Sequence, residues 1–157
     1  MQHKGESAMK ESKVKLKGRM KAALRKADGS VEYFERDNLI VDVGLDFICD
    51  AMAKASGRPA VLSYIGIGTG TTPADATDTA LQTEAAREAT TYDHDAGTNF
   101  MELVATFDAG TGTGDITEAG VFNAASSGTM LNRVVFSAIP KEASDSLDMS
   151  FTFTFTL

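Results

Sequence analysis

The C-terminal segment alternates strictly between large apolar side chains and small polar ones. Its apolar positions are Leu147, Met149, Phe151, Phe153, Phe155 and Leu157. Successive side chains of a β-strand point to opposite faces, so this pattern predicts a strand with one buried face. A strand this apolar is an aggregation hazard at an open sheet edge. We therefore expect it to lie inside a sheet or beneath another chain.

The same alternation occurs near the N-terminus, but its polar face is basic. Its apolar side comprises Val14, Leu16, Gly18, Met20, Ala22 and Leu24, and its basic side comprises Lys13, Lys15, Lys17, Arg19 and Lys21. Asp28-Gly29 is a strong turn signal, and Val31–Phe34 begins a return strand. The sequence predicts a hairpin over about residues 13–36.

One segment has helical rather than strand periodicity. Leu45, Ile48, Cys49 and Met52 recur at helical spacing, which predicts a helix over about residues 43–54 with these side chains on its buried face. Asp42 is the expected N-cap, and Gly57 with Pro59 follows the end of the helix. On this face Cys49, the single cysteine, would be a buried, unreactive thiol.

The remaining segments indicate short strands separated by Gly- and Thr-rich turns. Strands are expected near residues 61–68, 84–91, 100–107, 116–122 and 130–136, and Ile139-Pro140-Lys141 is expected to break the chain. Roughly seven or eight strands and one helix favour a mainly β fold, an antiparallel β-sandwich. We expect residues 13–157 to form that single domain and residues 1–12 to be a flexible tail.

Charge is distributed very unevenly along the chain. The net charge is −7, yet residues 1–26 hold nine Lys and Arg against two acidic residues. The rest of the chain is therefore strongly acidic, and such asymmetry affects association more than fold. The basic row has three interpretations: a solvated face, a contact with an acidic neighbouring subunit, or a nucleic-acid contact. No aromatic residue interleaves with the cations, which disfavours nucleic acid.

Candidate chemical sites are poorly supported. The Gly66–Thr72 loop follows a strand as a phosphate loop does, but no Gly-Lys-Ser/Thr follows and Pro73 interrupts the expected helix start. Asp93 and Asp95 are weak calcium candidates without EF-hand spacing. No catalytic set or cofactor motif is found, so we expect neither enzymatic activity nor a cofactor. No apolar run is long enough for a membrane span, and no secretory signal is expected.

Glu118 and Arg133 occur in two strands that we expect to be adjacent. Leu131, Val134 and Val135 flank the arginine, which predicts partial burial. The favoured interpretation is a structural ion pair rather than a reactive site.

The order of the motifs resembles that of small virion structural proteins of tailed bacteriophages. The relevant segments are Asn38–Asp46, Ile65–Pro73, Asp78–Leu81, Glu84–Arg87, Ile116–Phe122, Met130–Val134, Ile139–Lys141 and the terminal strand. In that group, which includes amino-terminal parts of tail-fibre and baseplate proteins, a Glu-x-Gly-Leu/Val-Phe strand recurs, as in Glu118–Phe122.

The resemblance implies a non-enzymatic component of the virion, assembled in the host cytoplasm. Its partners would be copies of itself and other virion proteins, with no membrane contact. The expected role is an adaptor, collar or tail-associated protein of the tail, neck or baseplate that forms a symmetric homo-oligomer. Two alternatives remain open: a capsid decoration protein, and a carbohydrate- or calcium-binding module.

Overall fold

The computed structural model describes residues 11–157, and within this range it contains nine β-strands and one α-helix. The strands are β1 (Lys15–Arg25), β2 (Val31–Ile40), β3 (Tyr64–Gly68), β4 (Glu84–Ala89), β5 (Thr91–Asp93), β6 (Phe100–Phe107), β7 (Gly114–Phe122), β8 (Met130–Lys141) and β9 (Ser146–Thr156). The helix is α1 (Asp42–Ala53). The fold is therefore mainly β with a single helix, as predicted. The tail expected at residues 1–12 lies almost entirely outside the described residues.

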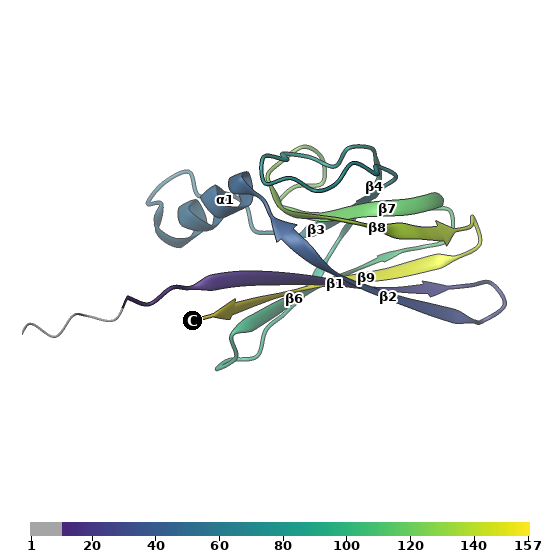
Figure 1. Ribbon diagram of the computed structural model, residues 1–157, viewed down its shortest axis with the longest axis horizontal. Helices are drawn as coiled ribbons and strands as arrows, with labels where there is room; N and C mark the ends of the chain where they lie inside the picture. The colour runs from purple at the N-terminus through teal and green to yellow at the C-terminus, as the bar shows by residue number, and fades with distance from the viewer. Residues whose placement is uncertain (1–10) are drawn as a thin grey trace, which may run out of the picture.

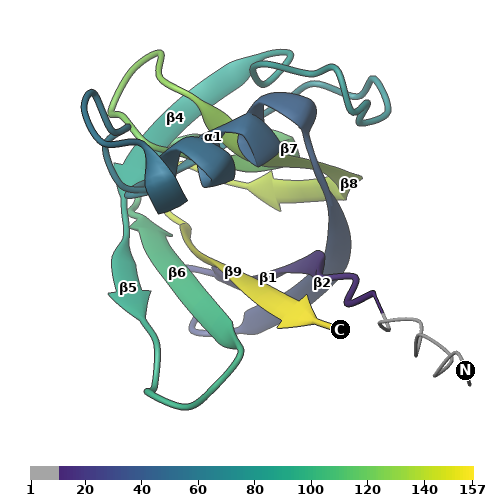
Figure 2. The same cartoon turned by 90° about the vertical axis from the view of Figure 1, so that its left-hand side faces the viewer.

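The strands form one antiparallel sheet in the order β4-β3-β7-β8-β2-β1-β9-β6-β5. The sheet folds over on itself into two facing halves, and β2 joins them because it pairs with β1 on one side and with β8 on the other. The two ends of the sheet, β4 and β5, are consecutive in the chain and separated by Thr90. Figure 2 shows the resulting nearly closed shape, with α1 lying across one end.

The terminal alternating segment lies inside the sheet, as expected. β9 pairs with β1 along one edge and with β6 along the other. Phe151 and Phe153 are fully buried, and their rings stack with centroids 6.1 Å apart. These side chains pack with inward residues of β1 and β6, which include Met20 and Leu103, so strands from both ends of the chain share one core.

The expected N-terminal hairpin is confirmed and is longer than predicted. The β1–β2 turn places Gly29 at φ 87°, a conformation that glycine adopts without strain. The Asp28 carboxylate accepts hydrogen bonds from the backbone and hydroxyl of Ser30. Figure 1 shows β2 running from this turn across the molecule to α1.

The helix lies where it was predicted, and Ile48 packs against the main core as expected. The prediction of a buried side chain was wrong for Leu45, Cys49 and Met52, which are exposed. Gly44 and Phe47 are its buried residues. The reason is close backbone contact: a Cβ at Gly44 would overlap the carbonyl of Leu131 on β8. The side of α1 that carries Gly44 therefore faces β8, where a residue without a side chain allows the two backbones to approach closely. The residue at the N-cap is Val41, with no side-chain cap, so the expected Asp42 cap is also wrong.

Two strand boundaries differ from expectation. β8 continues through Pro140, which pairs with Asp115 of β7, so the predicted break at residues 139–141 does not occur. At this point β8 has no hydrogen-bonded strand on its other side, and proline is tolerated in such edge positions. β5, which has only three residues, was not predicted separately.

Candidate interaction surface

The predicted basic row lies on the outer face of the sheet, at and just before β1. Its members are all exposed: Lys13, Lys15, Lys17, Arg19 and Lys21. Strand pairing places hydroxyl side chains of β9 beside them, with Thr156 opposite Lys15 and Thr154 opposite Lys17. The alternation of this segment thus sets a row of cations next to a row of threonines.

Only one cation of this row forms an ion pair within the described chain. Arg19 contacts Glu35 at 2.7 Å and Asp37 at 3.0 Å, both on β2. The hydrogen bond and charge of the guanidinium hold the pKa of Glu35 below its ordinary value. Among residues 11–157, no ion pair involves the four lysines of the row, so these charges remain available to a partner.

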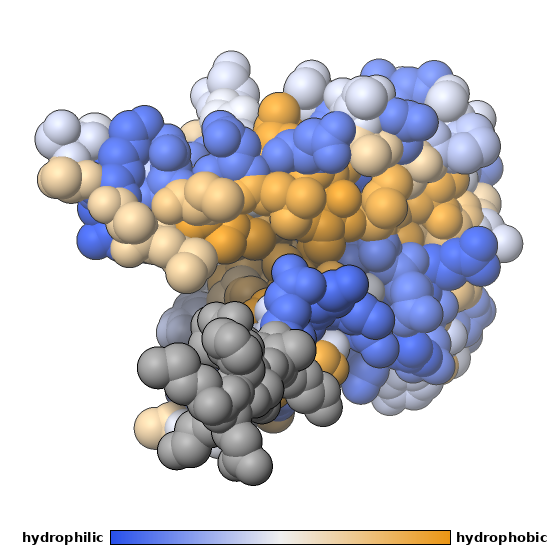
Figure 3. All heavy atoms as spheres, turned by 60° about the vertical axis from the view of Figure 1, so that its left-hand side comes forward, coloured by the Kyte–Doolittle hydropathy of each residue, from blue (hydrophilic) through white to orange (hydrophobic). Residues whose placement is uncertain are grey.

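An apolar groove of about 780 Å³ lies at the end of the sheet beneath α1. Its walls come from α1, the segment after it and five strands: Leu16, Phe47, Ile48, Ala51, Met52, Arg58, Pro59, Val61, Leu62, Tyr92, Met101, Leu103, Leu131 and Phe155. Three of these side chains are strongly exposed: Met52 at 78%, Val61 at 76% and Tyr92 at 64%. Figure 3 shows the corresponding hydrophobic band on this face of the molecule.

The groove and the basic row meet at Leu16. This side chain lines the groove and also a neighbouring polar hollow formed with Lys17, Arg19 and Lys21. Arg58 adds a further cation to the groove wall. The same end of the protein therefore presents an apolar channel with positive charge beside it.

The sequence pattern did not reveal the groove. Met52 was assigned to the buried helix face, although it lies at the open rim. Val61 belongs to an apolar run after Pro59, which was interpreted as the start of a strand, whereas β3 begins only at Tyr64. The apolar residues between Pro59 and β3 were the one sequence signal for the groove. Helical or strand periodicity does not reveal a groove that several separate segments form together.

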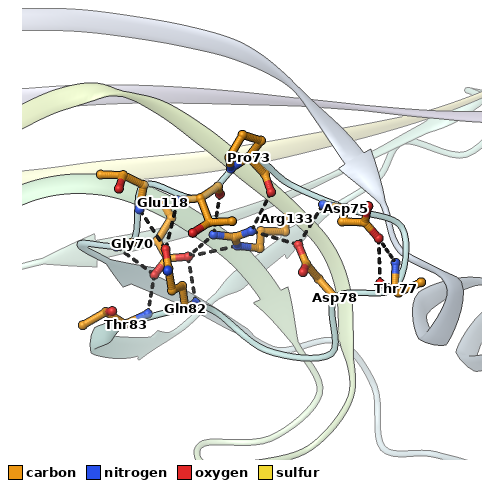
Figure 4. Close-up of polar contacts among 11 residues, drawn as sticks. Gly70, Pro73, Asp75, Thr77, Asp78, Gln82, Thr83, Glu118 and Arg133 are labelled. Atoms are coloured by element: carbon orange, nitrogen blue, oxygen red, sulfur yellow. Dashed lines mark hydrogen bonds and ion pairs between the residues drawn. The ribbon is translucent and has the colours of Figure 1, made fainter.

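The glycine-rich loop after β3 and the residues just before β4 together surround a carboxylate of the protein itself. Glu118 Oε1 accepts hydrogen bonds from the backbone N–H of Gly70 (3.1 Å) and Thr83 (2.7 Å), and Oε2 accepts one from Gln82 (2.9 Å). Figure 4 shows the carboxylate inside this cradle. Only Gly70 of the glycine-rich loop donates to this carboxylate, and the other two donors lie just before β4. The contacts hold the loop against β7, which favours the structural interpretation of the loop.

The predicted ion pair between Glu118 and Arg133 is present at 2.9 Å. Arg133 also contacts Asp78 at 2.8 Å and donates a hydrogen bond to the carbonyl of Thr72, so one guanidinium joins β8 to two points of the segment between β3 and β4. Burial alone would raise the pKa of Glu118. The backbone donors and Arg133 outweigh that effect and lower this pKa. The network fixes a loop rather than forming a reactive site.

The weak calcium candidates Asp93 and Asp95 do not form a ligand cluster. Within residues 11–157, no group of three or more His, Cys, Asp or Glu side chains could hold a metal ion. His94, which lies between them, donates its Nδ1 hydrogen bond to the carbonyl of Phe100 at 2.7 Å. These residues shape the β5–β6 turn.

Comparisons with protein-family models, curated proteins and solved structures gave no match for this chain. In the part of the chain that the structure describes, no helix is long and apolar enough to cross a membrane.

Proposed function

We propose that this chain is a non-enzymatic structural protein of a tailed-bacteriophage virion, an adaptor that docks on another virion protein and associates with copies of itself. The observation that carries the proposal is the groove beneath α1, where Met52, Val61 and Tyr92 leave large apolar side chains exposed. Contiguous exposed apolar surface of this kind is typical of a protein–protein contact.

The shape and chemistry of the groove favour a protein segment over a small metabolite. Small-molecule sites combine apolar walls with several polar groups that converge on the ligand. Here the walls are almost entirely apolar, and Arg58 is the single charged residue among them. A segment bearing apolar side chains would bury this surface without demanding specific polar contacts.

The charges beside the groove define the partner further. Lys15 and Lys17 are exposed and lie on the strand that also supplies Leu16 to the groove wall. We infer that the docking segment carries acidic residues beside its apolar ones, because opposite charges speed and orient association. In this account the basic row is a docking feature rather than a nucleic-acid contact.

The assignment to a phage particle is supported by the order of the sequence motifs. The segment Glu118–Phe122, which resembles the recurring strand of that group, forms the buried half of β7 beside β3 and β8. A position at the tail, neck or baseplate is proposed first, and capsid decoration is the alternative position within the same class.

Particle composition tests this proposal. Particles assembled from the genome that encodes the chain are purified and their proteins quantified by mass spectrometry. We expect the chain at a fixed copy number relative to the major capsid protein, with immunogold label at the tail or neck. Label spread over the capsid would favour decoration. A chain that stays in the lysate and is absent from particles would refute the proposal.

A further inference from the structure

β2 has an open edge over most of its length. It pairs with β1 from Val31 to Asn38, but on its other side it meets β8 only at Leu39 and Ile40. The backbone of residues 31–37 therefore has no strand partner on that side within the described chain. Unpaired edges of this length are templates for another strand.

The turn determines which backbone groups point to the open edge. The N–H of Lys26 donates to the carbonyl of Ser30, and the register continues without a bulge through Arg25–Val31. In an antiparallel ladder, hydrogen-bonded and non-hydrogen-bonded pairs alternate. The even-numbered residues of β2 therefore bond to β1. The backbone N–H and C=O groups of Val31, Tyr33, Glu35 and Asp37 therefore point away from β1, toward the open edge of β2.

The sequence of this edge is complementary to itself when two copies run antiparallel. With a two-fold axis at Phe34, Glu32 lies opposite Arg36 of the second copy, and Arg36 lies opposite its Glu32. Residues whose backbone groups point to the open edge then lie opposite one another, with Tyr33 facing Glu35 of the second copy, as hydrogen bonding between the two strands requires. Opposite charges across a strand pair stabilise it, and paired aromatic side chains do so as well.

Charge also discriminates against the neighbouring registers. An axis at Glu35 would place two glutamates directly opposite each other, which destabilises a strand pair. An axis at Tyr33 would place Glu32 opposite Phe34 and leave its charge uncompensated. Of these three axes, only the one at Phe34 places Glu32 opposite Arg36.

The two charges are free to make this contact. Glu32 and Arg36 are exposed, and neither takes part in an ion pair among residues 11–157. Glu35, by contrast, is already held by Arg19. Phe34 is half-buried and packs against the main core of its own copy.

We propose that two copies of this chain associate through antiparallel pairing of their β2 edges, centred on Phe34. The partner is a second copy because Glu32 and Arg36 exchange places about this axis, so each faces its opposite charge in the other copy. The pairing joins the β2-β1-β9-β6-β5 halves of two copies into one continuous sheet, and it leaves the groove beneath α1 free because no β2 residue lines that groove. This interface rests on the proposed function only in that the chain associates with copies of itself.

Variants that reverse one charge, or exchange the two charges, test the interface. Sedimentation equilibrium measures the monomer–dimer equilibrium of each full-length variant. We expect the unmodified chain to be dimeric. Glu32→Arg and Arg36→Glu should each weaken dimerisation at least about tenfold, because each places like charges in opposition. The double variant E32R/R36E restores opposite charges and should restore the dimer. Glu142→Arg, an exposed reversal away from this edge, should leave the dimer unchanged.

A backbone variant provides a second test. Tyr33→Pro removes an outward-pointing N–H without breaking a bond to β1, so it should prevent dimerisation while the chain stays folded. Circular dichroism checks folding in every variant.

A chain that is monomeric at all concentrations would overturn the inference. A dimer that survives both single reversals and Tyr33→Pro would also overturn it. Neither result bears on whether the chain is incorporated into particles, so failure of this interface is distinguishable from failure of the proposed function.

Discussion

Glu118 of β7 and Arg133 of β8 form an ion pair of 2.9 Å in which the two side chains are 0% and 2% exposed. Because the pair is buried, removal of one partner leaves a charge without compensation. We expect Arg133→Met to lower the free energy of unfolding by about 3–5 kcal/mol, measured by urea denaturation. Arg19→Met removes two exposed ion pairs, to Glu35 and Asp37, and should cost much less, because solvent screens exposed pairs. Equal losses would contradict the structural role assigned to Glu118.

The same carboxylate makes stability depend on pH. The pKa of Glu118 in the folded protein lies below its ordinary value of 4.5, because hydrogen bonds and Arg133 outweigh the effect of burial. The unfolded chain therefore takes up the proton first as pH falls. The stabilisation is fully present above about pH 4.5 and is lost as pH drops through the folded-state pKa.

Urea midpoints measured from pH 7 to pH 3 should therefore decline for the unmodified protein. Glu118→Gln should be less stable at pH 7 and should decline less steeply, because it lacks the titrating group. The pKa of Asp145 is also lowered, so some decline will remain in the variant. Parallel curves for the two proteins would show that Glu118 is not the group responsible.

At Gly44, helix propensity and packing predict opposite effects. Alanine inside a helix is usually more stable than glycine by about 1 kcal/mol. A Cβ at Gly44 would overlap the Leu131 backbone, so Gly44→Ala should instead destabilise the protein by about 1–3 kcal/mol. Asp46→Ala at an exposed helix position is the control, and thermal unfolding measures both. A higher melting temperature for Gly44→Ala would mean that the helix does not dock on β8 in this way.

The last strand should be required for folding itself. β9 lies between β1 and β6, and Phe153 is fully buried. Deletion of residues 153–157 should yield insoluble or unfolded protein, as judged by solubility and circular dichroism. Deletion of Leu157 alone, which is 90% exposed, should have little effect. A soluble and folded long truncation would contradict the central position of β9.

Part of the fold was predictable because β1 and β9 alternate strictly between apolar and polar side chains. The alternation of β9 revealed its buried face, and the Asp28-Gly29 turn revealed the first hairpin. The Glu118–Arg133 pair was predictable from charges inside otherwise apolar strands. These features depend on local pattern, which a single sequence displays directly.

The helix face and the groove were not predictable, because contacts between distant segments determine them. Gly44 faces the sheet because the Leu131 backbone lies there, and no periodicity within α1 encodes that contact. Met52 was consequently assigned to the core, although it is exposed at the groove. The open edge of β2 likewise depends on where β8 diverges from it.

Incorporation of groove variants into particles tests whether the chain docks through the groove beneath α1. Met52→Glu places a charge on the rim of the groove, where the native side chain is 78% exposed, so the fold should be retained. Leu45→Glu is the matched control, since Leu45 lies on the same helix, is 50% exposed and does not line the groove.

The measured quantity is the copy number of each variant in purified particles, determined by mass spectrometry. We predict that Met52→Glu is largely lost from particles, while Leu45→Glu is incorporated at the level of the unmodified chain. Normal incorporation of Met52→Glu would contradict docking through the groove.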